Sequence, residues 1–379
     1  MNNKTQEYRI CTKCIMDTTD PGIIFDDKGV CNHCHKMEKL LKLFPLDKSA
    51  DIKLQKIIED IRLSGKGNKY DCLIGVSGGV DSTYMAYMVK ELGLKPLAVH
   101  FDNGWNSELA VSNIKNTLKK LDIDLVTYVM DWEEFKDLQL SFLKASVSDA
   151  EVPTDFGIFA TLFNTANQYN IKYILGGSNL RTEGIMPACW TYGVTDEKYV
   201  RSVHKIFGKV PLKVYPKLKM SKWLYYLYFK KIKNVLLLNY MPYDKKKAMD
   251  IIEEKLEWRN YGGKHYESIY TRFFQSYILP RKFNIDKRKA HLSTLINSGQ
   301  ISRNEALEEM KVDICDIEKM EDDKEYVIKK FGFKNDEFDE LMKLPVKNHK
   351  EYPSYYPFIQ RMKGAVNLAK RFKLWPEVH

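Results

Sequence analysis

The sequence predicts an α/β protein built on a parallel sheet, with a small metal-binding unit before the sheet and a helical region after it. Three observations predict this class. Short apolar runs alternate with longer helical patterns between residues 71 and 175, as in parallel sheets covered by helices on both faces. The first apolar run ends in the Gly-rich stretch 77–82. Two C-x-x-C pairs precede it.

The composition is that of an ordinary globular protein, with 44% hydrophobic and 29% charged residues. A chain of 379 residues has room for two or three domains. Its first residues lack the apolar run of a secretion signal, and lysines interrupt its most apolar stretch, 223–241. We therefore expect a cytoplasmic protein with no membrane partner. The net charge of +10 suits either nucleic acid or ATP with an anionic small substrate, and does not decide between them.

Residues 1–48 predict a zinc ribbon. Each C-x-x-C pair presents two thiolates from a tight turn, and two pairs complete a tetrahedral site. Turn sequences flank 23–25 between the pairs, which indicates a hairpin. The expected Zn²⁺ ligands are Cys11, Cys14, Cys31 and Cys34. An iron–sulfur cluster or a redox pair is the alternative, and disulfides are disfavoured in the cytosol. His33 and His35 are expected to be bystanders, and the site structural.

The elements that follow can be assigned from their hydrophobic patterns. Residues 50–63 have apolar side chains at helical spacing. The predicted strands are 71–76, 96–101, 125–129 and 172–175, and the predicted helices are 81–92, 106–121, 132–146 and 155–169. Beyond residue 195 the strand signal fades and helical patterns rich in aromatic residues and lysine dominate. We therefore expect an α/β core over 49–195 and a mostly helical region over 196–379.

The stretch Ser-Gly-Gly-Val-Asp-Ser predicts a phosphate-binding loop. It joins a predicted strand to a predicted helix, whose first N–H groups have no partner within the helix and attract anions. Glycines let a phosphate approach the backbone, and the serines add hydroxyl donors. The residues expected to bind are Ser77, Gly78, Gly79, Val80, Asp81 and Ser82. A Gly-rich turn without a ligand is the alternative.

Other candidate residues lie where strands end or where glycines and charges gather. Asp102 ends one strand and could hold a ribose or magnesium, or cap the helix that starts near residue 107. Gly177 and Ser178 end another strand, where the nucleotide would lie against the backbone or the chain would simply turn. Lys264 and Arg272 are candidate clamps for phosphate charge.

These motifs together resemble the N-acetyl sugar amidotransferase family of the PP-loop ATP pyrophosphatase superfamily. The resemblance covers nearly the whole chain and rests on 11–19, 31–34, 77–82, 101–105, 176–179 and 261–268. It implies a PP-loop fold like that of adenine nucleotide alpha hydrolases, and a role in lipopolysaccharide O-antigen or pseudaminic-type acetamidino sugars. AMP from ATP would be placed on the acetamide oxygen of a nucleotide sugar, and ammonia would then displace AMP.

The resemblance also implies roles for single residues. The loop, with Asp81 and Mg²⁺, would hold the leaving pyrophosphate, and Lys264 would stabilise developing charge. Glu183 or Glu267 would position ammonia or take its proton. The remaining cysteines lack the setting of a glutaminase nucleophile, so ammonia would come from a partner glutaminase, directly or through a cyclase-like subunit. Nucleic acid is not expected as a partner.

Two rival functions remain open. A PP-loop tRNA sulfur transferase also joins a cysteine ribbon to this loop, and would need catalytic cysteines such as Cys72 or Cys189. A catalytically inactive ATP-binding scaffold is the other, although an intact loop argues against it.

Overall fold

A five-stranded parallel sheet forms the centre of the protein in the computed structural model, which describes residues 7–263 and 266–371. Its strand order is β3-β2-β1-β4-β5. The strands are β1 (Cys72–Gly75), β2 (Pro96–Asp102), β3 (Leu125–Val129), β4 (Tyr173–Leu175) and β5 (Lys233–Val235). The four predicted strands and the α/β class are confirmed. Beyond residue 195, where the strand signal of the sequence fades, β5 adds to β4 at the edge of the sheet.

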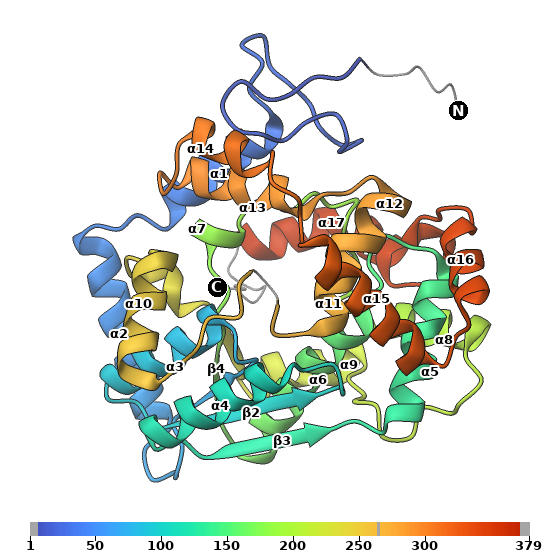
Figure 1. The fold of residues 1–379 in the computed structure, drawn as a ribbon. Helices are drawn as coiled ribbons and strands as arrows, with labels where there is room; N and C mark the ends of the chain where they lie inside the picture. The colour runs from blue at the N-terminus through green and yellow to red at the C-terminus, as the bar shows by residue number, and fades with distance from the viewer. Residues whose placement is uncertain (1–6, 264–265, 372–379) are drawn as a thin grey trace.

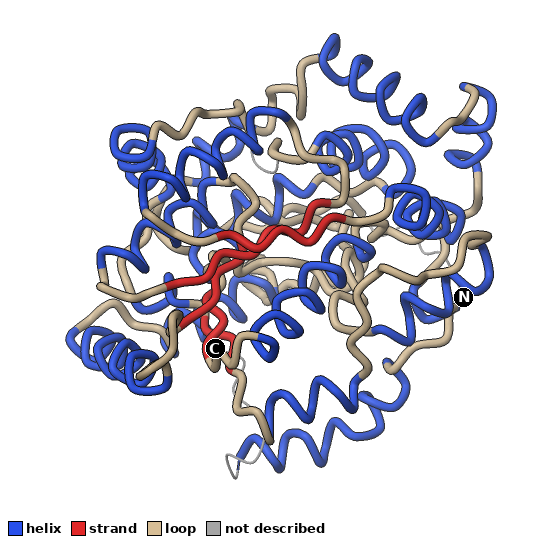
Figure 2. The backbone as a smooth tube through the Cα atoms, turned by 90° about the horizontal axis from the view of Figure 1, so that it is seen from below, coloured by secondary structure: helices blue, strands red, loops and turns tan. Residues whose placement is uncertain are grey.

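Alternation along the strands covers both faces of the sheet. In β1, Leu73 enters one apolar cluster, whereas Cys72 and Ile74 enter a second cluster on the other face. In β2, Leu97 and Val99 belong to the first cluster. Successive side chains of a strand point to opposite faces, so the two clusters are the two layers that pack against the sheet (Figures 1 and 2).

The predicted helices and one further helix, α10, supply these layers. One cluster contains side chains of α2 (Lys48–Ser64), α3 (Val80–Glu91), α4 (Glu108–Leu121) and α10 (Lys245–Leu256), and the other contains those of α5 (Trp132–Ala145) and α6 (Val152–Gln168). Ser107 accepts from the Ala110 N–H at the start of α4, and Asp131 does the same for Glu134 in α5. These side-chain caps fix where each helix begins.

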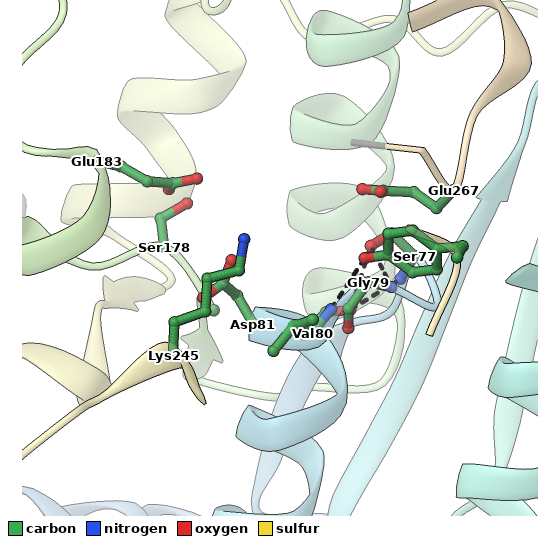
Figure 3. A pocket seen from close by; sticks show the side chains of 11 residues that line it. Ser77, Gly79, Val80, Asp81, Ser178, Glu183, Lys245 and Glu267 are labelled. Atoms are coloured by element: carbon green, nitrogen blue, oxygen red, sulfur yellow. Dashed lines mark hydrogen bonds between the residues drawn. The ribbon is translucent and has the colours of Figure 1, made fainter. Parts of the chain in front are cut away.

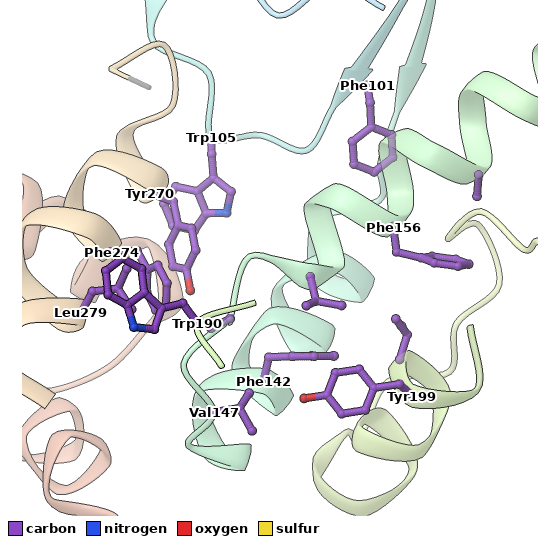
Figure 4. Packing of buried hydrophobic residues seen from close by; sticks show 14 of the residues in the cluster. Phe101, Trp105, Phe142, Val147, Phe156, Trp190, Tyr199, Tyr270, Phe274 and Leu279 are labelled. Carbon is purple, nitrogen blue, oxygen red and sulfur yellow. The ribbon is translucent and has the colours of Figure 1, made fainter. Parts of the chain in front are cut away.

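An aromatic core joins the sheet to the C-terminal region (Figure 4). Trp105, just after β2, packs against Tyr270 with ring centroids 5.2 Å apart. Its indole N–H donates to Gln139 at 2.6 Å, which satisfies a polar group that is otherwise buried. Phe274 stacks on Tyr270, so the helices after residue 267 are anchored on the α/β core.

The region after residue 195 is mostly helical, as expected. Besides α10, its α-helices are α8 (Glu197–Phe207), α9 (Met220–Tyr228), α11 (Ile269–Phe273), α12 (Leu279–Phe283), α13 (Lys287–Asn297), α14 (Arg303–Glu309), α15 (Ile317–Phe331), α16 (Asn335–Lys343) and α17 (Tyr356–Arg371). One π-helical turn, 274–278, links α11 to α12. Within the described residues, none of the helices has both the length and the apolarity needed to cross a bilayer.

The N-terminal segment with α1 (Asn32–Leu43) lies beside α13 and α14, far from it in sequence (Figure 1). The Ile15 N–H donates to the Ser293 hydroxyl at 3.2 Å. Antiparallel bridges pair Ile10 with Asp17 and Phe25 with Cys31. The segment is therefore a small β-bridged unit held by the C-terminal helices.

Candidate nucleotide site and cysteine cluster

The loop between β1 and α3 is organised by its own hydroxyl groups. The Ser82 hydroxyl accepts from the Ser77 N–H at 3.2 Å and lies 3.1 Å from the Ser77 hydroxyl. The Ser77 hydroxyl in turn accepts from the Gly79 N–H at 3.3 Å. Helix α3 begins at Val80, with Gly79 as a cap that provides no side chain. The start of the helix is therefore open toward the carboxyl edge of the sheet, where ligands of such sheets bind.

Two glycines allow close approaches that a side chain would prevent. Gly78 has φ +81°, and a Cβ there would lie 2.5 Å from the Ala110 carbonyl oxygen. The Gly78 carbonyl accepts from the Trp258 indole N–H at 2.9 Å. A Cβ at Gly177, after β4, would lie 3.1 Å from the Asp81 backbone. The loop is thus packed between α4, α3 and the end of β4.

These elements enclose a cavity of about 190 Å³ (Figure 3). Predicted residues supply most of the lining: Ser77, Gly79, Val80, Asp81, Ser82, Gly177, Ser178, Glu183 and Glu267. Sequence reasoning missed two lining residues, Lys245 and Tyr261. Lys245 opens a run of three lysines and Tyr261 begins the segment 261–268, and neither pattern by itself predicts a residue of the cavity.

The cavity is more acidic than a bare phosphate site. Asp81, Glu183 and Glu267 bring three carboxyl groups, and Lys245 brings the one amine among the lining residues that the structure describes. Figure 3 shows Lys245 extending beside Asp81, with Glu183 and Glu267 on opposite sides. A polyphosphate would be repelled by this lining unless a cation shared the charge.

Two tyrosines tie the acidic groups to the surrounding helices. The Tyr243 hydroxyl donates to the Asp81 carboxylate. Burial and that carboxylate raise the pKa of Tyr243, so the phenol stays protonated as a donor. The Tyr261 hydroxyl accepts from the Val80 N–H at 3.2 Å. Burial and the neighbouring Glu267 raise the pKa of Tyr261. Residues after 240 therefore complete one wall of the cavity.

Two other described candidates, Asp102 and Arg272, do not line this cavity. Asp102 accepts from the Gly104 N–H at 2.9 Å and from the Asn106 side chain at 3.3 Å, which shapes the turn after β2. Arg272 makes a two-pronged ion pair with the buried Asp323, both contacts being 2.6 Å. Lys264 lies outside the described residues.

Four thiols gather in the N-terminal unit. Cys11, Cys14, Cys31 and Cys34 are buried, and their Sγ atoms all lie within 4.8 Å of one another. Three of the Sγ–Sγ distances are 3.7, 3.8 and 3.9 Å. A tetrahedron with Zn–S bonds of about 2.3 Å has edges of about 3.8 Å, whereas a disulfide brings its sulfurs to about 2.05 Å. The cluster thus has the dimensions of a four-thiolate metal site.

The cluster is supported from outside the ribbon. The Asn297 side chain donates to the Cys34 sulfur at 3.3 Å. The Arg303 guanidinium donates to the carbonyls of Cys14 and Cys11 at 3.0 and 3.1 Å. Such contacts orient ligands and neutralise thiolate charge. The histidines lie elsewhere: His33 contacts Asp20 at 2.6 Å and His35 contacts Asp26 at 2.8 Å.

Comparison with known proteins finds relatives that match limited spans of the chain. The chain is 28% identical over 174 residues to an uncharacterized protein of Methanocaldococcus jannaschii, covering 45% of this chain and 59% of that one. It is 30% identical over 165 residues to a glutamine-hydrolyzing GMP synthase of Pyrobaculum aerophilum, covering 42% and 30%. A tRNA-specific 2-thiouridylase of Fusobacterium nucleatum is 27% identical over 143 residues, covering 35% and 39%. The chain thus spans less than two thirds of each relative.

Two solved structures are similar over about half of the chain. NMN synthetase from Francisella tularensis gives a TM-score of 0.30 at 16% identity, covering 55% of this chain and 88% of that one. NH3-dependent NAD synthetase from Campylobacter jejuni gives 0.29 at 14% identity, covering 55% and 93%. Residues 267–364 match the family model described as LPS biosynthesis protein WbpG-like, C-terminal domain. The C-terminal part of the chain is therefore similar to that of the WbpG-like lipopolysaccharide biosynthesis proteins, which agrees with the role in lipopolysaccharide biosynthesis that the sequence motifs imply.

Proposed function

We propose that this protein is an ATP-dependent amidotransferase that converts the acetamido group of a nucleotide sugar into an acetamidino group. One observation carries the proposal. Glu267, the first residue of the matched lipopolysaccharide-biosynthesis domain, lies in the cavity of the phosphate-binding loop. A Cβ at Gly79 would lie only 3.2 Å from its Oε1 atom. One cavity is therefore lined both by the phosphate-binding loop and by a residue of the matched C-terminal domain.

The residues fit the two halves of the reaction. In the first half, the acetamide oxygen attacks the α-phosphorus of ATP and the bond to the β-phosphate oxygen breaks, giving an O-adenylyl imidate and pyrophosphate. The N–H groups at the start of α3 and the hydroxyls of Ser77 and Ser82 would hold the pyrophosphate. Lys245 would balance charge at the α-phosphate. Asp81 would hold Mg²⁺, which when bound shares the phosphate charge.

In the second half, ammonia adds to the imidate carbon and AMP leaves with the former acetamide oxygen. Glu183 and Glu267 face the cavity from opposite sides (Figure 3), so either would orient ammonia and take the proton it loses. The ammonia would come from a partner glutaminase. The resemblance to a glutamine-hydrolyzing GMP synthase supports this nitrogen source. Zn²⁺ in the cysteine cluster would have a structural role, because four thiols leave no open position.

Oxygen transfer tests this chemistry directly. Nucleotide sugars with a heavy-oxygen label in the acetamide carbonyl are incubated with the protein, ATP, Mg²⁺ and ammonium. The proposal expects the label in AMP and a sugar in which NH replaces the oxygen. Asp81→Asn should abolish both, whereas Asp102→Asn, outside the cavity, should retain them. Pyrophosphate release that is independent of the sugar, or label that never reaches AMP, would overturn the assignment.

The sulfur-transfer alternative is disfavoured by the cysteines. Cys72 is fully buried in β1, and burial raises the pKa of its thiol. Burial and the hydrogen bond to Asp20 raise the pKa of Cys189 to about 12. Thiols protonated at neutral pH are weak nucleophiles. Resemblance to a 2-thiouridylase is therefore better explained by the shared PP-loop.

A further inference from the structure

The positive charge of the chain is concentrated in one segment. Residues 198–233 contain ten lysines and one arginine but no Asp or Glu, a formal charge of +11. The whole chain carries +10, so all other residues together sum to −1. None of the residues in this segment lines the nucleotide cavity that the structure describes. The excess charge is therefore not explained by ATP binding.

The basic side chains of the segment lie at the surface. Ten of the eleven are exposed: Lys198, Arg201, Lys205, Lys209, Lys213, Lys217, Lys219, Lys222, Lys231 and Lys233. The acidic groups beneath the segment bind its backbone instead. Glu134 accepts from the N–H groups of 213, 214 and 215 at 2.5 to 3.0 Å, and Asp137 accepts from those of 209 and 210 at 2.8 and 3.0 Å. Both carboxylates are buried, which leaves the lysines facing solvent.

Apolar side chains are exposed among these lysines. On the inner side of α9, Trp223 packs against Phe159 with ring centroids 5.6 Å apart. On the outer side, Tyr225 and Phe229 stack on each other and are 45% and 77% exposed. Ile206, at the end of α8, is 56% exposed. In Figure 1, α8 and α9 lie beside α5 and α6, away from the N-terminal unit.

We propose that the exposed basic and aromatic side chains of residues 198–233, here called the basic–aromatic surface, dock the protein on an anionic membrane. Lysines next to apolar side chains suit a bilayer surface, because the amines meet lipid phosphates while the rings enter the acyl boundary. Nucleic-acid surfaces favour arginine, which binds phosphate with a two-pronged fork. The one arginine here, Arg201, is paired with Glu197 at 2.8 Å. The expectation of no membrane partner rested on spanning segments, and surface docking does not need one.

Vesicle binding by the full-length protein tests this surface. We expect cosedimentation with vesicles of phosphatidylcholine and about 30% phosphatidylglycerol, but not with phosphatidylcholine alone. Raising salt from about 50 to about 500 mM should weaken binding, because surface charges are screened. Lys219→Glu with Lys231→Glu, which reverses two of the exposed charges, should lower affinity at least about tenfold. Lys53→Glu with Lys56→Glu, the same charge change on exposed positions of α2, should leave it within about twofold.

Variants of Phe229 test the contribution of the apolar side chains to vesicle binding separately. Phe229→Ser should weaken binding at both salt concentrations, because apolar burial is not screened. A Phe229→Trp variant should shift its emission to the blue on vesicles and be quenched by brominated lipids, and a melting curve checks its fold. Equal losses in both lysine pairs, or no quenching of Phe229→Trp, would overturn the proposal. Tighter binding of single-stranded RNA that displaces the vesicles would instead assign the surface to nucleic acid.

Discussion

Replacing Gly78 with alanine tests whether the loop geometry is set by contact with α4. Gly78 has φ +81°, and the Cβ of an alanine at this position would lie 2.5 Å from the Ala110 carbonyl oxygen. Ordinary carbon–oxygen contacts are about 3.3 Å or longer. The loop or α4 must therefore move by about 0.8 Å to accept the methyl group.

The expected loss of stability has three parts. The left-handed backbone costs about 1–2 kcal/mol for an L-residue. Overpacking against α4 costs about 1–3 kcal/mol. Movement of the loop also weakens the 2.9 Å hydrogen bond from Trp258 to the Gly78 carbonyl, which contributes about 1 kcal/mol. Together Gly78→Ala should lower the free energy of unfolding by about 3–6 kcal/mol.

Gly67 provides the matched control. Its φ is +83°, but nothing lies within 4 Å of its future Cβ. Gly67→Ala should therefore cost only the backbone part, about 1–2 kcal/mol, and leave pyrophosphate release intact. Gly78→Ala should lose about a hundredfold in release, because a shift near 1 Å misplaces the reacting groups. Denaturant unfolding and a pyrophosphate assay measure both. Equal destabilisation by the two variants would refute the contact with Ala110 as the reason for glycine.

Three further predictions follow from the structure. We expect metal analysis of the purified protein to find zinc, which Cys34→Ser should abolish and Cys189→Ser should retain. Arg272→Met should lower the unfolding free energy by about 3–5 kcal/mol, because it leaves the Asp323 carboxylate buried without its partner, while calorimetry finds ATP affinity unchanged. Burial lowers the pKa of Lys282 to about 8. Below that pH the buried, charged amine destabilises the folded protein, and this destabilisation disappears as the pH rises from about 8 toward 10.5. The melting temperature of Lys282→Met should accordingly be higher than that of the unmodified protein at pH 7, and the difference should shrink at high pH.

Local pattern was sufficient to predict the central fold. The buried strands are short apolar runs, and helix starts carry caps such as Ser107 and Asp131. The edge strand β5 lacks these signals, since Lys233 and Asn234 are polar and the strand has three residues. It is a strand because β4 offers an open edge to pair with. Such pairing depends on tertiary structure and is not visible in the segment itself.

The candidate site also contains some residues that the sequence could predict and others that it could not. Ser77 to Ser82 could be predicted, because one continuous motif places hydroxyls, glycines and a helix start together. Lys245 enters the cavity only because α10 packs against α3, a contact between segments far apart in sequence. Arg272 looked equally suitable as a cation, but its partner Asp323 is 51 residues further on. A cation's role therefore depends on which carboxylate folding brings to it.

The parts of the chain that line the cavity bear on which substrates it can distinguish. The loop itself offers backbone N–H and hydroxyl groups, which would bind the phosphates of any nucleotide. Lys245, Tyr261 and Glu267, all beyond residue 240, add side chains to the lining next to the loop. Among these, Glu267 lies close to Gly79, where a carboxylate repels phosphate but attracts a cation or an ammonia-derived nitrogen. Discrimination between nitrogen and other nucleophiles is therefore expected to reside in the C-terminal region, and Glu267→Gln should lower the rate with ammonium more than the affinity for ATP.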